Sequence, residues 1–207
     1  MSRALALLAA VVAAGVVGCG GSTAPQSQPG GPGDQHSGPG AIINSETVSE
    51  PAVPDAASVR RVTYQSRSGV DDSTTHVTGS VYIPKGLAPP GGFHVVGYGP
   101  AVYGTTSDCG SARSPAVIDM LLKAGYVVAV PDYQGLGEPS DGERLYHPAL
   151  DSTTAGYNLM DAVRAAKKQV DDTSPIWAAV GEVQGGQAAW AVNELADNTG
   201  SKVCAAP

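Results

Sequence analysis

A glycine-rich turn between a strand-like segment and a helix-like segment is the part of this sequence best suited to chemistry. Residues 181–186 read GEVQGG, directly after the apolar run 176–180 and directly before helical sequence from Gln187. A strand, a sharp turn and a helix form the setting of a nucleophile elbow, G-x-S-x-G, which exposes a serine for attack on an acyl carbon. The third position here is Val183. Valine has no attacking oxygen, so no acyl-enzyme can form through it.

The backbone at Val183 is open to two interpretations. The third residue of such an elbow is forced into an unfavourable conformation, and a β-branched residue is among the worst choices for positive φ. Either the turn keeps this conformation at a cost of about 1–3 kcal/mol, or it has relaxed out of elbow geometry. The glycine spacing also suits an ordinary βα turn, although it does not match the dinucleotide-binding pattern G-x-G-x-x-G.

The elements that must position this turn follow from hydrophobic periodicity. Alternating or β-branched sequence predicts strands at 62–66, 76–84, 93–99, 126–131 and 176–180, with another beginning near Val203. Helical spacing predicts helices at 115–124, 153–170 and 187–195. A hairpin that leads into alternating strands and helices predicts an α/β fold with a mostly parallel sheet and flanking helices.

The N-terminus has the pattern of an export signal. Residues 1–18 have a basic start followed by an apolar run, which predicts a signal peptide too short to span a bilayer comfortably. Residues 16–19, VVGC, resemble a bacterial lipobox, which implies a lipid on Cys19; the alternative is cleavage elsewhere, with Cys19 an incidental thiol. Residues 19–57 are predicted to be a disordered Gly/Pro/Ser-rich tether, and residues 58–207 a globular domain. This layout predicts an exported protein held on the membrane at the cell surface.

Charge narrows the range of partners. The chain of 207 residues has a formal net charge of −7, and its basic doublets, at 60–61 and 167–168, are expected on solvated surface. This composition argues against a nucleic-acid partner, which would need clustered Lys and Arg. No cofactor and no metal site are predicted. Cys109 and Cys204 would meet an oxidising compartment, but the sequence does not decide whether they pair.

Several stretches, in the same order along the chain, resemble the secretory lipases of bacteria and fungi, which belong to the α/β-hydrolase superfamily. Residues 183–188, VQGGQA, resemble the elbow stretch S-Q-G-G-x-A, and residues 132–137, DYQGLG, resemble D-Y-x-G-L-G. Residues 103–106, YGTT, resemble the H-G-T-T loop, and His147-Pro148 before a long helix also fits. The resemblance covers residues 59–207 and implies the N-terminal portion of an α/β-hydrolase fold.

The resemblance assigns roles to particular residues. It places Val183 at the nucleophile position and Gly181, Gly185 and Gly186 at the elbow glycines. The backbone N–H of Gln184 would be one oxyanion-hole donor, and the Gly104-Thr105 region would supply the other. Each such donor is worth about 2.7–4 kcal/mol to catalysis.

The acid and base of a triad are expected after the elbow helix, in the order Ser, Asp or Glu, His. Asp197 lies downstream but is assigned to the end of the elbow helix. The histidines, His36, His76, His94 and His147, all precede the elbow, and none is expected to be the base. The sequence therefore predicts an inactive and C-terminally truncated domain whose elbow strand lies near an exposed, aggregation-prone edge.

Three functions remain open. The first is the family's own activity, hydrolysis of carboxylic esters such as triacylglycerols in lipid catabolism. The second is a catalytically silent surface lipoprotein that binds an acyl ester, a lipid or a protein partner. The third is a truncated gene product without a function. The residues favour the last two over an active enzyme and do not separate them.

Overall fold

The structure is a computed structural model that describes residues 37–48, 53–107, 111–112, 114–137, 146–199 and 204–205. The expected signal peptide, Cys19, His36 and Cys109 lie outside the described residues, as does the side chain of Cys204. Their roles, including the pairing of Cys109 with Cys204, stay predictions. None of the helices in the described segments has the length and apolar content needed to cross a membrane.

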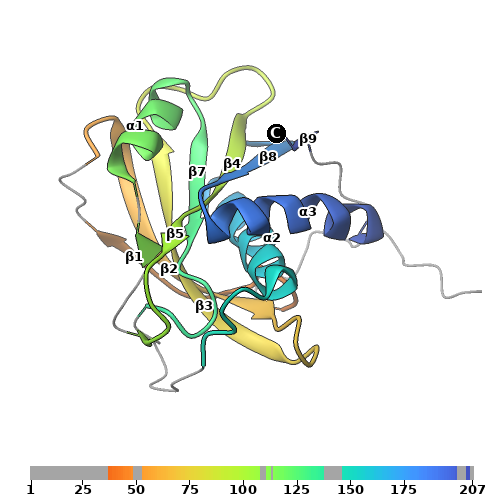
Figure 1. The fold of residues 1–207 in the computed structure, drawn as a ribbon. Helices are drawn as coiled ribbons and strands as arrows, with labels where there is room; N and C mark the ends of the chain where they lie inside the picture. The colour runs from red at the N-terminus through yellow and green to blue at the C-terminus, as the bar shows by residue number, and fades with distance from the viewer. Residues whose placement is uncertain are drawn as a thin grey trace, which may run out of the picture. The chain divides into compact units, whose positions relative to one another are not determined.

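A mixed sheet forms the centre of the described domain (Figure 1). Its strand order is β1-β2-β3-β7-β4-β8-β9. The pairs β1–β2, β2–β3 and β3–β7 are antiparallel, and the pairs β7–β4, β4–β8 and β8–β9 are parallel. A separate ribbon pairs β5 (Ala101–Val102) with β6 (Ser111–Ala112). The strands of the main sheet are β1 (Ile42–Val48), β2 (Ala56–Arg67), β3 (Thr74–Pro84), β4 (Phe93–Gly99), β7 (Val127–Pro131), β8 (Thr173–Gly181) and β9 (Cys204–Ala205).

Helices cover both faces of this sheet. Along β7, Val127 and Ala129 join the core packed against α2 (Ser152–Gln169) and α3 (Gln184–Thr199), whereas Val128 and Val130 join the core under α1 (Pro115–Lys123). Successive strand residues point to opposite faces, so a strand covered on both sides must be apolar throughout. All five residues of β7 are buried, which explains its continuous β-branched sequence.

The predicted elements and the observed ones agree in type and order. The strand predicted at 93–99 has the same bounds as β4, and most other ends differ by a few residues. The mostly parallel α/β arrangement with flanking helices is confirmed. β8 is not the outermost strand, because β9 pairs with it at Ala178 and Ala179.

The predicted start of the domain at residue 58 differs from the structure. β1 lies in the segment assigned to the disordered tether, yet it pairs antiparallel with β2 from Ile42 to Val48. Five successive residues of β1 are exposed, so the strand has no alternation of apolar and polar residues to reveal it. Backbone pairing with β2 holds it in place, and periodicity does not detect such pairing.

A buried polar cluster joins β2, α2 and the loop after β7. Asn158, on α2, is fully buried; its Nδ2 donates to Ser66 Oγ at 2.9 Å, and its Oδ1 accepts from the backbone N–H of Gln134 at 2.8 Å. Ser66 in turn donates to the Asp161 carboxylate at 2.9 Å. Burial raises the pKa of Asp161. Each of these groups would be costly to bury without its partner.

Replacing Asn158 with leucine should destabilise the domain strongly. The change would leave the Gln134 N–H buried without its acceptor and would remove the hydrogen bond that the Ser66 hydroxyl accepts, and each such loss costs about 1–3 kcal/mol. Urea denaturation should therefore report a free energy of unfolding lower by about 2–5 kcal/mol. Asn193→Leu, at an exposed position on α3, is the matched control and should change it by less than about 0.5 kcal/mol. Equal effects of the two substitutions would contradict this account.

Candidate functional site

The turn from β8 into α3 has the sharp geometry of an elbow. Val183 has a φ of 53°, in the left-handed region, and its side chain is 77% exposed. Of the two conformations that the sequence left open, the structure has the strained one. A β-branched residue adopts this conformation only when its surroundings over-determine it. The turn therefore presents the two methyl groups of a valine to solvent at the position where the resemblance to secretory lipases implies a serine.

The surroundings that impose this conformation are backbone groups of β4 and α3. A Cβ on Gly185 would lie 1.8 Å from the carbonyl oxygen of Gly99, and a Cβ on Gly181 would lie 2.1 Å from the carbonyl oxygen of Gly185. The N–H of Glu182 donates to the same Gly99 oxygen at 3.0 Å. Gly186 differs from the other two glycines, because a Cβ there would come no closer than 3.5 Å to its nearest neighbour. Only Gly181 and Gly185 are therefore required by close approach.

The backbone amide of Gln184 lies beside Val183 at the first residue of α3. Amides in the first turn of a helix have no acceptor within the helix, and the helix dipole favours negative charge near them. The next two amides already have acceptors within the turn. Gly185 N–H donates to Glu182 O at 2.8 Å, and Gly186 N–H donates to Val183 O at 3.1 Å. The Gln184 amide is thus the one beside Val183 whose position suits an anionic oxygen.

The second predicted donor region, Gly104 and Thr105, follows β4 and the short strand β5. β5 packs against α3 and pairs with β6, with Ala101 opposite Ala112. The loop after β5 therefore starts near the carboxyl ends of the parallel strands, as the elbow does. Gly104 is half-buried and Thr105 is exposed.

The stretch that follows β7 is held by a buried charge. Asp132 is 1% exposed, forms an ion pair with Arg61, and accepts a hydrogen bond from Thr78 Oγ1 at 2.6 Å. The next residue, Tyr133, has a φ of 68° and donates its hydroxyl hydrogen to Pro100 O at 3.3 Å. Burial raises the pKa of Tyr133. Asp132 and Tyr133 therefore hold the loop after β7 in place beside the site.

His147 has a contact that the sequence reasoning did not predict. The ring is buried, and its Nδ1 lies 2.9 Å from the backbone oxygen of Gln134, so Nδ1 carries the hydrogen and donates it. Its Nε2 lies 3.1 Å from Gln184 Nε2 and accepts a hydrogen from it. With both nitrogens engaged, His147 connects the loop after β7 to the first residue of the elbow helix. The only sequence signal for this contact was the His-Pro pair before the long helix.

The remaining candidates lie away from the elbow or carry no described side chain. His76 is on β3, and His94 is near the start of β4, where its ring stacks on that of Tyr126 with centroids 6.5 Å apart. Asp197 belongs to α3, as expected, and its side chain is outside the described residues. Among the described residues, no group of three or more His, Cys, Asp and Glu side chains is arranged to hold a metal ion.

Tyr98, near the end of β4, is a further buried group near the elbow. Burial and the negative charge of Glu182 raise the pKa of Tyr98 to about 12. Its phenol is therefore neutral at physiological pH. Tyr98 belongs to the core on the α1 side of the sheet, and its role near the turn is therefore packing.

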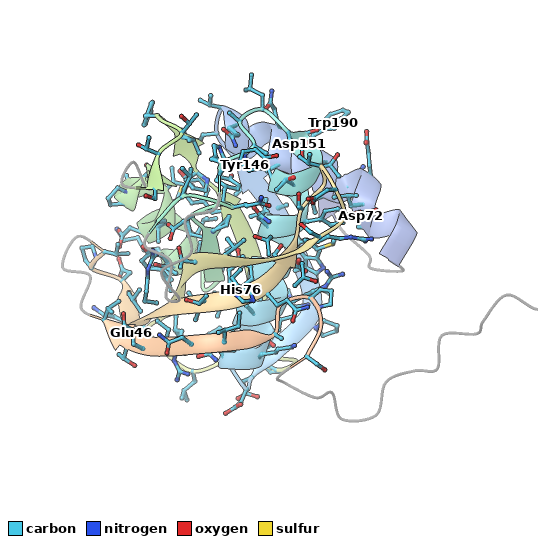
Figure 2. All side chains as sticks on the ribbon, turned by 90° about the horizontal axis from the view of Figure 1, so that it is seen from below. Glu46, Asp72, His76, Tyr146, Asp151 and Trp190 are labelled. Atoms are coloured by element: carbon cyan, nitrogen blue, oxygen red, sulfur yellow. The ribbon has the colours of Figure 1, made fainter. Side chains whose placement is uncertain are left out.

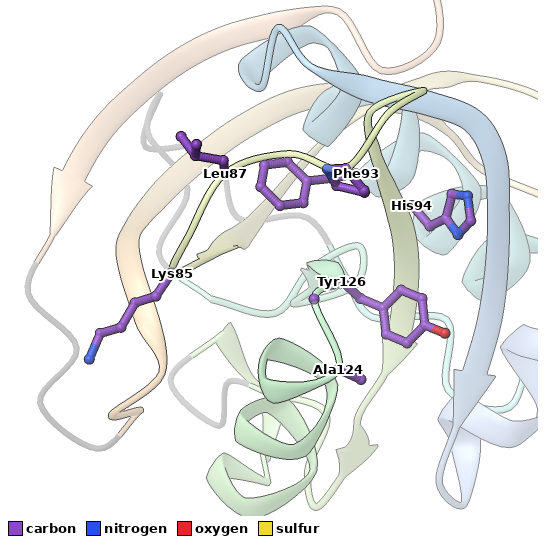
Figure 3. A pocket seen from close by; sticks show the side chains of 8 residues that line it. Lys85, Leu87, Phe93, His94, Ala124 and Tyr126 are labelled. Atoms are coloured by element: carbon purple, nitrogen blue, oxygen red, sulfur yellow. The ribbon is translucent and has the colours of Figure 1, made fainter.

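A separate pocket lies at the opposite end of the parallel strands, where β4 and β7 begin (Figure 3). Phe93 and His94, at the start of β4, line it together with Tyr126, which precedes β7. Lys85 and Leu87 come from the loop between β3 and β4. Because the elbow follows the carboxyl end of the parallel strand β8, this pocket is not part of the candidate site.

The fold is similar to that of several solved hydrolases, lipases and esterases. A hydrolase of Legionella pneumophila matches with a TM-score of 0.63 and 21% identity, over 80% of this chain and 51% of that one. Candida antarctica lipase A matches with a TM-score of 0.64 and 18% identity, over 81% of this chain and 41% of that one. The rice cell wall degrading esterase LipA of Xanthomonas oryzae matches with a TM-score of 0.59 and 23% identity, over 77% and 46%.

The described domain thus has an α/β-hydrolase fold, and the chain spans about half or less of the length of these structures. No protein-family model matches the sequence. No curated protein sequence matches it significantly.

The two neighbouring glycines of the elbow helix should respond oppositely to alanine. Gly185→Ala puts a methyl group against the Gly99 carbonyl and should lower the free energy of unfolding by about 1–3 kcal/mol or more. Gly186→Ala meets no close neighbour, and it should be neutral or stabilising by up to about 1 kcal/mol, because alanine favours a helix. Thermal and urea unfolding of both variants would measure this difference. A Gly186→Ala variant as unstable as Gly185→Ala would be inconsistent with the elbow described above.

Proposed function

We propose that this chain is a lipase- or esterase-like protein of the α/β-hydrolase fold that does not hydrolyse esters as it stands. The observation that carries the proposal is Val183, which lies at the tip of the elbow with a φ of 53° and an exposed side chain. The position that presents the attacking oxygen in an elbow presents only methyl groups here, so nucleophilic catalysis through it cannot begin.

The positions of the described histidines also support the proposal that the chain does not hydrolyse esters. Elbow catalysis needs a general base within hydrogen-bond reach of the nucleophile. His147 is the described histidine that contacts the elbow helix, but Gln134 and Gln184 occupy its two nitrogens. His76 and His94 lie on strands β3 and β4. Within the described part of the chain, no histidine is placed to take a proton at position 183.

The groups at the elbow are suited to binding a ligand without reacting with it. The Gln184 N–H is positioned for a carbonyl or carboxylate oxygen, and Val183 adds apolar surface beside it. Such a combination suits an acyl ester or a fatty-acid ligand, which would be held without turnover. We assign the chain to the secretory lipase family on the sequence stretches around the elbow, residues 132–137 and residues 103–106, as an inactive relative.

The same proposal includes export. The basic and apolar N-terminus and the VVGC sequence support a lipoprotein that reaches the cell surface and is held on the membrane through a lipid on Cys19. Several acyl chains on one residue would hold it firmly, since a single chain binds only marginally.

The purified protein should not hydrolyse p-nitrophenyl esters above the rate of a heat-treated control. The reason is the missing oxygen at position 183, and the measurement is release of p-nitrophenolate with short and long acyl chains. Val183→Ser should recover little activity, because no histidine in the described part of the chain is placed to act as its base. Turnover that a serine-directed fluorophosphonate abolishes, or strong activity of Val183→Ser, would overturn the proposal.

Lipid attachment should depend on Cys19. Expressed in a bacterium that processes lipoproteins, the chain should partition into the detergent phase and incorporate labelled palmitate. Cys19→Ala should lose both properties, because its side chain offers no sulfur for the lipid. Cys204→Ala is the matched control and should retain both. Palmitate incorporation that persists in Cys19→Ala would rule out this attachment site.

A further inference from the structure

Strand β1 forms one margin of the main sheet. It pairs with β2 along one of its sides, and no other strand in the described part of the chain pairs with it along the other side. Figure 2 shows Glu46, a residue of β1, at this margin. Residues 43–47 are all exposed. An edge strand presents backbone N–H and C=O groups to which a further strand can add.

The hydrogen bonds of β2 indicate which of its backbone groups face β1. Gln65, on β2, donates its N–H to Ala41 O at 2.8 Å, and its carbonyl oxygen accepts from Gly40 N–H at 2.8 Å. The backbone groups of Gln65 are therefore directed toward the β1 side. β2 pairs with β3 without a register shift over this stretch, and residues of a regular antiparallel strand direct their backbone groups to alternate sides. Thr63 and Arg61 therefore face β1 as well.

The register between the two strands then gives the groups of β1 that point outward. Asn44 lies opposite Thr63, and Glu46 lies opposite Arg61. Their N–H and C=O groups are thus used within the pair of strands. Ser45 lies between them, so its N–H and C=O are directed away from β2, toward the open margin.

β1 lacks most of the features that block pairing at the edge of a sheet. Edges are commonly protected by Lys or Pro, but residues 42–48 contain neither, and Glu46 is their one charged residue. The single register shift with β2 lies at the start of the strand. Arg60 and Arg61 lie opposite Thr47 and Glu46 on β2, so they offset the negative charge at this margin, although the whole chain carries −7.

We propose that two copies of this chain associate by antiparallel pairing of their β1 strands, with Ser45 on the two-fold axis. The Ser45 residues of the two copies would exchange N–H and C=O hydrogen bonds across the axis. Because antiparallel partners are counted in opposite directions, Glu46 of each copy would lie opposite Asn44 of the other. The two sheets would then continue into one another.

Charge selects this register and favours a second copy as the occupant. A pairing centred on Glu46 would bring two carboxylates directly opposite each other, which destabilises a pair of strands. The pairing centred on Ser45 places each carboxylate opposite an uncharged amide instead. A two-fold axis applies each favourable pair twice, because such an interface is self-complementary. This association goes beyond the proposed function and does not depend on it, since no residue of the elbow takes part.

The test measures the oligomeric state of the full chain and the exchange of individual amide hydrogens. Sedimentation velocity should show a monomer at low protein concentration and a dimer as the concentration rises. In hydrogen exchange followed by NMR, the Ser45 N–H should be protected only under the conditions that give the dimer. The Glu46 N–H faces β2 and should be protected in monomer and dimer alike.

Substitutions in β1 test the register. Ser45→Pro removes the N–H at the axis in both copies and should raise the Kd of the dimer at least about tenfold. Ser45→Ala is its matched control: it loses the side-chain hydrogen bond to Gln169 but keeps the backbone N–H, and it should change the Kd by less than about twofold. Asn44→Glu places a second carboxylate opposite Glu46 and should raise the Kd about twofold to tenfold, whereas Asn44→Gln should leave it unchanged.

Far-UV circular dichroism verifies that each variant is folded, and Asn44→Glu carries the test if Ser45→Pro does not fold. A chain that stays monomeric at every concentration would overturn the proposal. A dimer that keeps its Kd in Ser45→Pro or in Asn44→Glu would also overturn it, because the contact would then lie on another surface. The same holds for a dimer in which the Ser45 N–H exchanges as fast as in the monomer.

Discussion

The contact between the carbonyl oxygen of Gly99 and the backbone at Gly185 is the constraint on which the site depends. A side chain at Gly185 could not fit, because its Cβ would lie 1.8 Å from that oxygen. The N–H of Glu182 donates to the same oxygen, so the end of β4 holds both sides of the turn. The chain must reverse within a few residues, and Val183, at the tip, takes the conformation that remains.

Other contacts hold the neighbouring loop against this turn. Asn158 binds the backbone of Gln134, and the carbonyl of Gln134 in turn accepts from His147, whose other nitrogen contacts Gln184. These hydrogen bonds lead from the buried face of α2 to the first residue of the elbow helix. Each group in the series satisfies another buried group, which makes the arrangement costly to disturb.

The elbow and its missing oxygen differ in their physical origin. The sharp turn depends on glycines, backbone hydrogen bonds and buried side chains spread over several elements. An attacking oxygen at the tip would depend on one exposed side chain, and Val183 has no such oxygen. The turn keeps its strained conformation whatever side chain its tip carries, because the surrounding contacts over-determine that conformation.

The sequence by itself determined the elements and their order. Continuous β-branched runs predicted β4 and β7, helical spacing predicted α2, and the glycines around Val183 predicted a sharp turn after β8, because periodicity and glycine content report local structure. It missed β1, whose exposed residues have no alternation, and it left the conformation of Val183 open. It also treated three elbow glycines alike, although only Gly181 and Gly185 face backbone atoms within contact distance.

Tertiary structure alone decided which distant groups meet. It paired His147 with Gln184 and buried Asp132 against Arg61. These contacts join residues far apart in the chain, and no local pattern records which of them the packing of strands and helices brings together.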